Sequence, residues 1–203
     1  TASRGAQWQD SGTHIYRMLS GLLVNPLGLA LSHPLHFWLG RFAAWLSPEN
    51  PAYAITLISS LAGAAAIANL FGCTAYLTGS RAAGAFAACT LAVAHTFWQM
   101  STIAETYTLV TAILSAEVWC LVAFLRSGRP GFFWLAFAFN GLGLANHNSA
   151  LLTTPVLVCV LLLSIRKGKL KPRELLVTAG VWLVASLPFT GLVLVELIGA
   201  VRA

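Results

Sequence analysis

The stretch that decides the fold is "YAITLISSLAGAAAIANLFGCTAYL", residues 53–77, which runs for 25 residues without a charged side chain. A hydrocarbon core of roughly 30 Å is crossed by about 20 helical residues, so this stretch predicts a transmembrane helix. The whole chain has the same character, with 58% hydrophobic and 9% charged residues and a mean hydropathy of +0.77. Soluble domains carry about a quarter charged residues, so the composition predicts an integral membrane protein.

Further apolar stretches follow this one along the chain. Because backbone groups in lipid must be satisfied internally, we expect them to be helices, and short connections make each an antiparallel neighbour of the next. The fold class predicted is therefore all-α, a polytopic transmembrane bundle in residues 51–203 preceded by an outer-face loop in residues 1–50. The six predicted spans lie near 53–77, 82–98, 104–125, 131–147, 149–165 and 174–198.

Residues 14–47 are apolar but contain no clean run of 18, because arginines, histidines and prolines interrupt them. We expect one or two helices lying in the membrane interface, with Trp38 and Trp45 at headgroup level. The chain opens at Thr1 without an initiator methionine and stops at Ala203 after an apolar run. We therefore expect a fragment of a longer protein.

The orientation of the chain in the membrane follows from its lysines and arginines, because short loops rich in these residues stay on the cytoplasmic side. Arg81, then Arg126 and Arg129, then "RKGKLKPR" at 166–173 all fall on one side if residues 53–77 enter from outside. The outer side then receives the polar residues Asp10, His14, His33, His36, Glu49, His95, Glu105, Asn146, His147 and Asn148. In a bacterium this side is the periplasm, and in a eukaryote it is the lumen of the endoplasmic reticulum.

Several classes of function are disfavoured. The net charge of +6 reflects scarce acids and one basic loop, and no basic patch interleaved with aromatics indicates a nucleic-acid partner. The four cysteines lie singly in apolar runs, without the paired spacing of a zinc site or disulfide framework. We predict no metal site from these residues.

Three polar segments are brought to the outer side by this topology: the region of Asp10 to Arg41, residues 95–107, and residues 144–149. Each has a plain structural interpretation. Asp10, the only aspartate, is typical of a helix cap, Glu105 of a carboxylate at a helix N-terminus, and the 146–148 triplet of a turn.

The pattern of all the segments together resembles a known family. "DSG" at 10–12, "SHPLHFWLGR" at 32–41, "AETYTL" at 104–109 and "GLANHNS" at 143–149 are similar to successive blocks of a bacterial membrane family, formerly a domain of unknown function. That family is related to the protein O-mannosyltransferases of the GT-C glycosyltransferase superfamily. Departures from its pattern are Thr13 in place of a second acid, Leu35 and His36 in place of Pro-Gly, and Thr106 in place of Val.

The resemblance implies a polyprenyl-phosphate sugar donor in the bilayer and a hydroxyl acceptor on protein or glycan at the outer face. The transfer needs a base to activate the acceptor, and a single carboxylate suffices for inversion at the anomeric carbon. We assign that role to Asp10. The donor phosphate is assigned to Arg41, Arg17, His33 and His36, and the cavity or acceptor contacts to Glu105, Tyr107, Trp98, Asn146 and His147. No cofactor is assigned beyond the lipid-linked sugar, and assistance by a divalent cation is left open.

Two other functions are weighed against this one. A transporter or ion-pathway protein would distribute ionisable groups through the membrane depth, whereas only Glu117 lies in the middle of a predicted span. A haem or quinone protein would place facing histidine pairs inside the bundle, whereas the histidines here fall in outer turns.

Overall fold

The structure, a computed structural model, describes residues 2–4, 7 and 9–202, and every regular element in this part of the chain is a helix. The all-α prediction is thereby confirmed. The elements in chain order are α1 (Gln9–Ser20), the 3-10 helix η1 (Leu29–Leu31), α2 (Pro34–Leu46), α3 (Pro51–Thr78), α4 (Arg81–Val93), α5 (His95–Thr102), α6 (Tyr107–Ser127), α7 (Pro130–Asn146), the 3-10 helix η2 (Asn148–Leu152), α8 (Thr154–Arg166) and α9 (Glu174–Arg202).

Four segments in the described part of the chain are long and apolar enough to cross a membrane. They are Pro51–Thr78, Tyr107–Ser127, Asn148–Arg166 and Glu174–Val201. The other two predicted spans correspond to shorter helices. The 82–98 stretch is broken at Ala94, directly before His95, leaving α4 with 13 residues or about 20 Å. Helix α7 has 17 residues, or about 25 Å, so a total of six crossings stays a prediction.

Glycine and proline set the ends of the long helices. Gly79 and Gly128 follow α3 and α6 with φ angles of 70° and 66°, the left-handed conformation that ends a helix most readily at glycine. Pro51 and Pro130 stand in the first turns of α3 and α7, where the missing N–H costs nothing. These signals keep the connections between neighbouring helices short.

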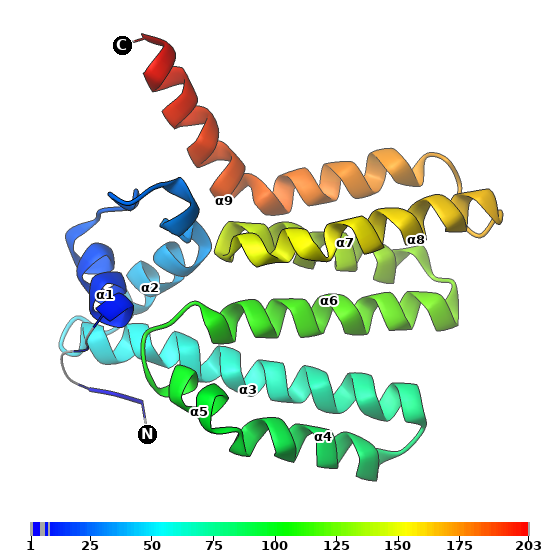
Figure 1. Ribbon diagram of the computed structural model, residues 1–203, viewed down its shortest axis with the longest axis horizontal. Coiled ribbons are helices and arrows are strands. Elements are labelled where there is room, and N and C mark those ends of the chain that lie inside the picture. The colour runs from blue at the N-terminus through cyan, green and yellow to red at the C-terminus, as the bar shows by residue number, and fades with distance from the viewer. Residues whose placement is uncertain (1, 5–6, 8, 203) are drawn as a thin grey trace.

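The helices are arranged as a bundle of long elements with two short helices across one end (Figure 1). Neighbours in contact include α3 with α4 and α6, and α7 with α6, α8 and α9. Helices α1 and α2, joined by a loop that contains η1, lie in the segment 14–47 where one or two helices were expected, and Trp38 and Trp45 are exposed. Their position relative to a membrane stays a prediction. Pro188 lies inside α9, which bends visibly in its second half (Figure 1).

The core combines tilted and edge-to-face aromatic contacts with close approach at small residues. Phe133 lies 4.6 Å from Phe124 and 5.2 Å from Phe137, measured between ring centroids, where α6 meets α7. Between α7 and α9 the contact depends on Gly141, because a Cβ atom there would lie 2.6 Å from the carbonyl oxygen of Trp182. Small residues that let backbones approach are the usual packing device of membrane helices.

We expect Gly141→Ala to lower the stability of the chain in detergent by about 1–3 kcal/mol, because the added methyl group overpacks against α9 backbone. Gly180→Ala is the matched control, since a Cβ atom at Gly180 would meet nothing within 4 Å. Thermal unfolding followed by circular dichroism measures both. Equal melting temperatures for the two variants would contradict the packing role given to Gly141.

Candidate active site at the α1–α2 end

Four segments meet at one end of the bundle: α1, α2, the loop before α6, and the turn between α7 and η2 (Figure 1). Parts of all three polar segments that topology was expected to gather therefore lie together, but residues 95–102 form α5, which lies away from α1 and α2. Polar side chains are buried here in unusual number, namely Ser11, His14, Arg17, Ser32, His33, His36, Glu105, Thr106, Thr108 and Asn146. Asp10, by contrast, is exposed.

Helix α1 presents Asp10, His14 and Arg17 on one face, because they are spaced four and three residues apart. Asp10 stands in the first turn of the helix, where a carboxylate interacts favourably with the helix dipole. His14 is a site residue that the sequence assignment missed. The helical spacing from Asp10 is the signal that identifies it.

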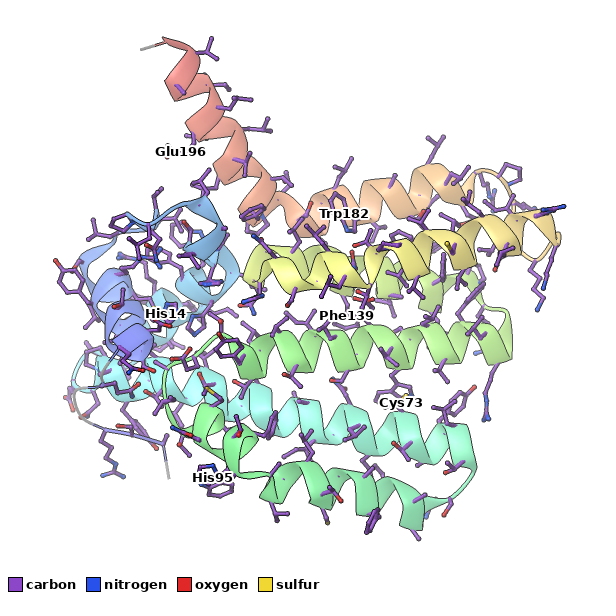
Figure 2. All side chains as sticks on the ribbon, in the orientation of Figure 1. His14, Cys73, His95, Phe139, Trp182 and Glu196 are labelled. Atoms are coloured by element: carbon purple, nitrogen blue, oxygen red, sulfur yellow. The ribbon has the colours of Figure 1, made fainter. Side chains whose placement is uncertain are left out.

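Four imidazole rings, those of His14, His33, His36 and His147, form what we call the histidine cluster. The ring centroid of His14 lies 5.5 Å from that of His33 and 5.3 Å from that of His36, both edge to face. His33 stacks on His147 with centroids 5.4 Å apart and planes 15° from parallel. Figure 2 shows His14 among the side chains of α1 and α2, and His95 on α5, away from them.

Hydrogen bonds fix the tautomers of two of these rings. Nδ1 of His33 lies 2.6 Å from the carbonyl oxygen of Asn146, which only accepts, so Nδ1 carries the proton and Nε2 is an acceptor. Nδ1 of His147 accepts from the backbone N–H of Ser149 at 3.2 Å, so in the neutral ring Nε2 carries the proton. His147 is half-buried and therefore offers an N–H donor at the rim of the cluster.

Burial keeps the cluster neutral. It lowers the pKa of His14 from 6.5 to about 4, with smaller contributions from the neighbouring charges of His33 and Arg17. Burial is also the main cause of the lowered pKa values of His33, His36 and His147. Both ring nitrogens of His36 are buried without a hydrogen-bond partner in the described residues. At pH 7 these rings act as dipoles rather than as cations.

Glu105 joins the loop before α6 to the start of α1. Its Oε1 accepts a hydrogen bond from Ser11 Oγ at 2.6 Å, and its backbone N–H and C=O both bond to Ser59 Oγ at 3.0 Å. Burial raises the pKa of Glu105, Asp10 raises it further, and the Ser11 hydroxyl opposes the rise. Because Ser11 adjoins Asp10 in the chain, this hydrogen bond ties the start of α1, which carries Asp10, to the loop before α6.

The two arginines assigned to the donor phosphate have different surroundings. Arg17 is 3% exposed and donates to the carbonyl oxygens of Leu22, Leu23, Leu31 and Ser32, which folds the segment between α1 and α2 around it. Arg41 is exposed and donates one N–H to the carbonyl oxygen of Met18 at 3.0 Å. Arg41 therefore keeps donors for a ligand, whereas Arg17 is mostly occupied by the backbone.

Of the remaining assigned residues, Asn146 and Tyr107 lie at this end of the bundle and Trp98 does not. Asn146 is buried, and its Nδ2 donates to the carbonyl oxygen of Thr106 at 3.1 Å. Tyr107 is half exposed, with its ring centroid 5.9 Å from that of His147. Trp98 lies instead on α5, beside a separate cavity of about 280 Å³. No group of three or more His, Cys, Asp or Glu in the described ranges has a geometry suited to a metal ion.

Glu117, the one acid in the middle of a long helix, is paired inside the bundle. Its Oε2 accepts a hydrogen bond from Asn140 Nδ2 at 3.2 Å, and Asn140 in turn accepts from Thr154 and Trp182. A carboxylate held by such a network ties α6 to α7, α8 and α9.

The family model described as the protein O-mannosyl-transferase TMEM260 N-terminal domain matches residues 30–171, more than two thirds of the chain. The chain belongs to this family. The likeness to protein O-mannosyltransferases that the sequence motifs indicate is thereby confirmed. No curated protein and no solved structure matches the chain.

The protein O-mannosyl-transferase match covers most of the gathered segments. It includes His33, His36, Arg41, Glu105 and the turn at 146–148, while Asp10 and α1 precede it. Together with the apolar helices, the match identifies an integral membrane protein of a glycosyltransferase family.

We expect this O-mannosyl-transferase domain to lose stability as the pH falls from about 6.5 to 4. The unfolded chain protonates its histidines near pH 6.5, before the buried rings do, and His14 alone accounts for about 2 kcal/mol at pH 5. Glu105 contributes with the opposite sign, because its raised pKa makes the folded state bind a proton first.

The measurement is the melting temperature in detergent at pH 7.5 and pH 5, for wild type and two variants. His14→Gln should reduce the loss on acidification, whereas His95→Gln, a change at an exposed ring outside the cluster, should not. A pH dependence unchanged by His14→Gln would exclude the histidine cluster as its source.

Proposed function

We propose that this chain carries the transfer site of an inverting GT-C-type glycosyltransferase. The enzyme moves mannose, or another hexose, from a polyprenyl-phosphate donor to a hydroxyl on protein or glycan. The site faces the outer side of the membrane, which is the periplasm in a bacterium and the lumen of the endoplasmic reticulum in a eukaryote. The family match supports the transfer of mannose, and the geometry around Asp10 supports the assignment of roles.

The proposal depends mainly on the contrast between the exposure of Asp10 and the burial of the polar side chains around it. Asp10 is the exposed acid beside a group of buried polar side chains, and it is close enough to raise the pKa values of His33 and Glu105. A carboxylate in this position is accessible to an acceptor hydroxyl from outside. The buried neighbours on α1 hold the helix that carries it, and a catalytic base needs such a support.

The reaction then proceeds in one displacement. Asp10 accepts the proton of the acceptor hydroxyl as its oxygen attacks the anomeric carbon of the donor. The bond between that carbon and the phosphate oxygen breaks, its electron pair goes to the phosphate, and the configuration of the sugar inverts. Products are the glycosylated acceptor and the polyprenyl phosphate.

The leaving phosphate gains negative charge in this step, and hydrogen-bond donors aimed at it lower the barrier. Arg41 and the Nε2–H of His147 are the donors available at the rim, and Tyr107 adds a hydroxyl beside His147. These three side chains are given this role because they are at least partly exposed and keep hydrogen-bond donors that can reach a phosphate. His33, His36 and Arg17, which are buried, are positioning residues in this scheme.

Asn146 and Glu105 hold the loops that bear these groups. Asn146 connects α2, through His33, to the loop before α6, through Thr106. Glu105 connects that loop to α1 through Ser11. The two contacts support a site in which Asp10, Tyr107 and His147 border one region of the surface.

The test compares the wild-type protein with its Asp10→Asn variant, using labelled polyprenyl-phosphate mannose and following release of polyprenyl phosphate. Asparagine keeps the shape but does not accept the proton, so we expect turnover to fall by about 10²–10⁴-fold with donor binding retained. Glu49→Gln is the matched control, because Glu49 is an exposed carboxylate at the α2–α3 connection.

Equal turnover by wild type and Asp10→Asn would remove Asp10 from the mechanism and leave Glu105 as the carboxylate to examine. Absence of turnover in wild type with every lipid-linked sugar offered would remove the transferase assignment itself.

A further inference from the structure

A cavity of about 450 Å³ lies between the C-terminal ends of α6 and α8, at the end of the bundle opposite the candidate active site. Its walls are apolar and include Leu125, Val160 and Leu163, and its rim carries Arg126, Lys167 and Lys169. Leu125 and Leu163 are both more than half exposed, so the cavity opens on the outside of the bundle. Helix α6, with 21 residues, places it about 30 Å from the histidine cluster.

The rim is strongly cationic. The connections at this end carry Arg81, Arg126, Arg129, Arg166, Lys167, Lys169, Lys171 and Arg173. The acid in the same connections, Glu174, is buried and held by Arg173 at 3.4 Å and by the indole N–H of Trp134 at 2.8 Å. In the ranges that the structure describes, Lys167 and Lys169 have no carboxylate within 4.0 Å.

The backbone fixes these cations at the rim. Gly168, with φ 69°, reverses the chain after α8, and the backbone N–H of Lys169 donates to the carbonyl oxygen of Ser164 at 2.9 Å. Lys167 and Lys169 therefore stand on either side of a defined turn. Arg126 is anchored by two hydrogen bonds at the end of α3, to the carbonyl oxygen of Tyr76 and, at 2.7 Å, to that of Leu77, and it keeps three of its five N–H donors.

The combination of charge and apolar wall identifies a class of ligand. The C-terminal ends of α6 and α8 contribute partial negative charges of about half an electron each, less than the three positive charges of the rim. A small soluble anion would interact with the cations but would gain nothing from contact with exposed leucine and valine side chains. An acidic lipid uses both, and basic pockets between membrane helices on the cytoplasmic side are typical sites for such headgroups.

We infer that this cavity binds an anionic phospholipid of the bilayer, with the phosphate at Lys167, Lys169 and Arg126 and the upper acyl chains against Leu125, Val160 and Leu163. The inference does not depend on the proposed transfer reaction. It assigns the cationic end of the bundle a lipid partner of its own, separate from the lipid-linked sugar at the other end.

The experiment uses the full-length protein in mild detergent and measures retained lipid by native mass spectrometry after addition of phosphatidylglycerol or phosphatidylcholine. We expect phosphatidylglycerol to be retained and phosphatidylcholine to be lost. The double variant Lys167→Gln/Lys169→Gln should retain at least fivefold less phosphatidylglycerol. Its matched control is Arg81→Gln/Arg129→Gln, which removes the same charge from exposed residues of the same end that do not line the cavity.

A second variant tests the apolar wall without a change in charge. Leu163→Trp fills the cavity and should also lower retention of phosphatidylglycerol. Equal losses of phosphatidylglycerol in the two double variants would overturn the inference, because they would show that retention depends on the overall positive charge of this end and not on the cavity. Equal retention of phosphatidylcholine and phosphatidylglycerol would overturn it as well. Tighter retention of polyprenyl phosphate than of phosphatidylglycerol, lost in Lys167→Gln/Lys169→Gln, would reassign the cavity to the lipid of the sugar donor.

Discussion

The hydrocarbon interior of the bilayer imposes the constraint on which this structure depends, because it contains no water to satisfy a peptide group. Long helices satisfy their own backbone, and polar chemistry is left to their ends. In this protein the two ends differ sharply. One gathers neutral histidines, a buried glutamate and an exposed aspartate, and the other gathers lysines and arginines around an apolar cavity. The length of α6 keeps these environments about 30 Å apart.

The site end is assembled by a few hydrogen bonds between segments that are far apart in sequence. His33 contacts the carbonyl oxygen of Asn146 across 113 residues, and Ser11 contacts Glu105 across 94. Each joins the α1–α2 region to the start or the end of a long helix, α6 for Glu105 and α7 for Asn146. His33 itself adopts the left-handed conformation, with φ 48°, directly before Pro34. A non-glycine residue in that conformation is held by its surroundings, so the contact to Asn146 both fixes the ring and secures the start of α2.

Composition and periodicity predicted the parts of this structure that the membrane dictates: the helices, their approximate positions and the gathering of Asp10, His33, Glu105 and Asn146 at one end. They did not predict features that depend on side-chain burial. His14 was missed as a site residue: its spacing from Asp10 puts both on one face of α1, but its packing against His33 and His36 arises only when α1 and α2 meet. Arg17 was assigned to phosphate, yet its guanidinium is mostly occupied by backbone carbonyls. The break at Ala94 and the bend at Pro188 divide stretches that the sequence predicts as single spans. Cys89 and Cys159, which lie in apolar runs of the sequence, are exposed on the bundle surface.

Photo-crosslinking of the full-length protein with polyprenyl-phosphate mannose bearing a diazirine on the sugar tests the central claim most directly, because it locates the donor without requiring turnover. The account predicts that the label attaches to residues around Asp10, Tyr107 and His147, and that natural polyprenyl-phosphate mannose prevents the labelling. Attachment at the opposite end, in the cavity between α6 and α8, would contradict it. Labelling that natural donor does not prevent would contradict it equally.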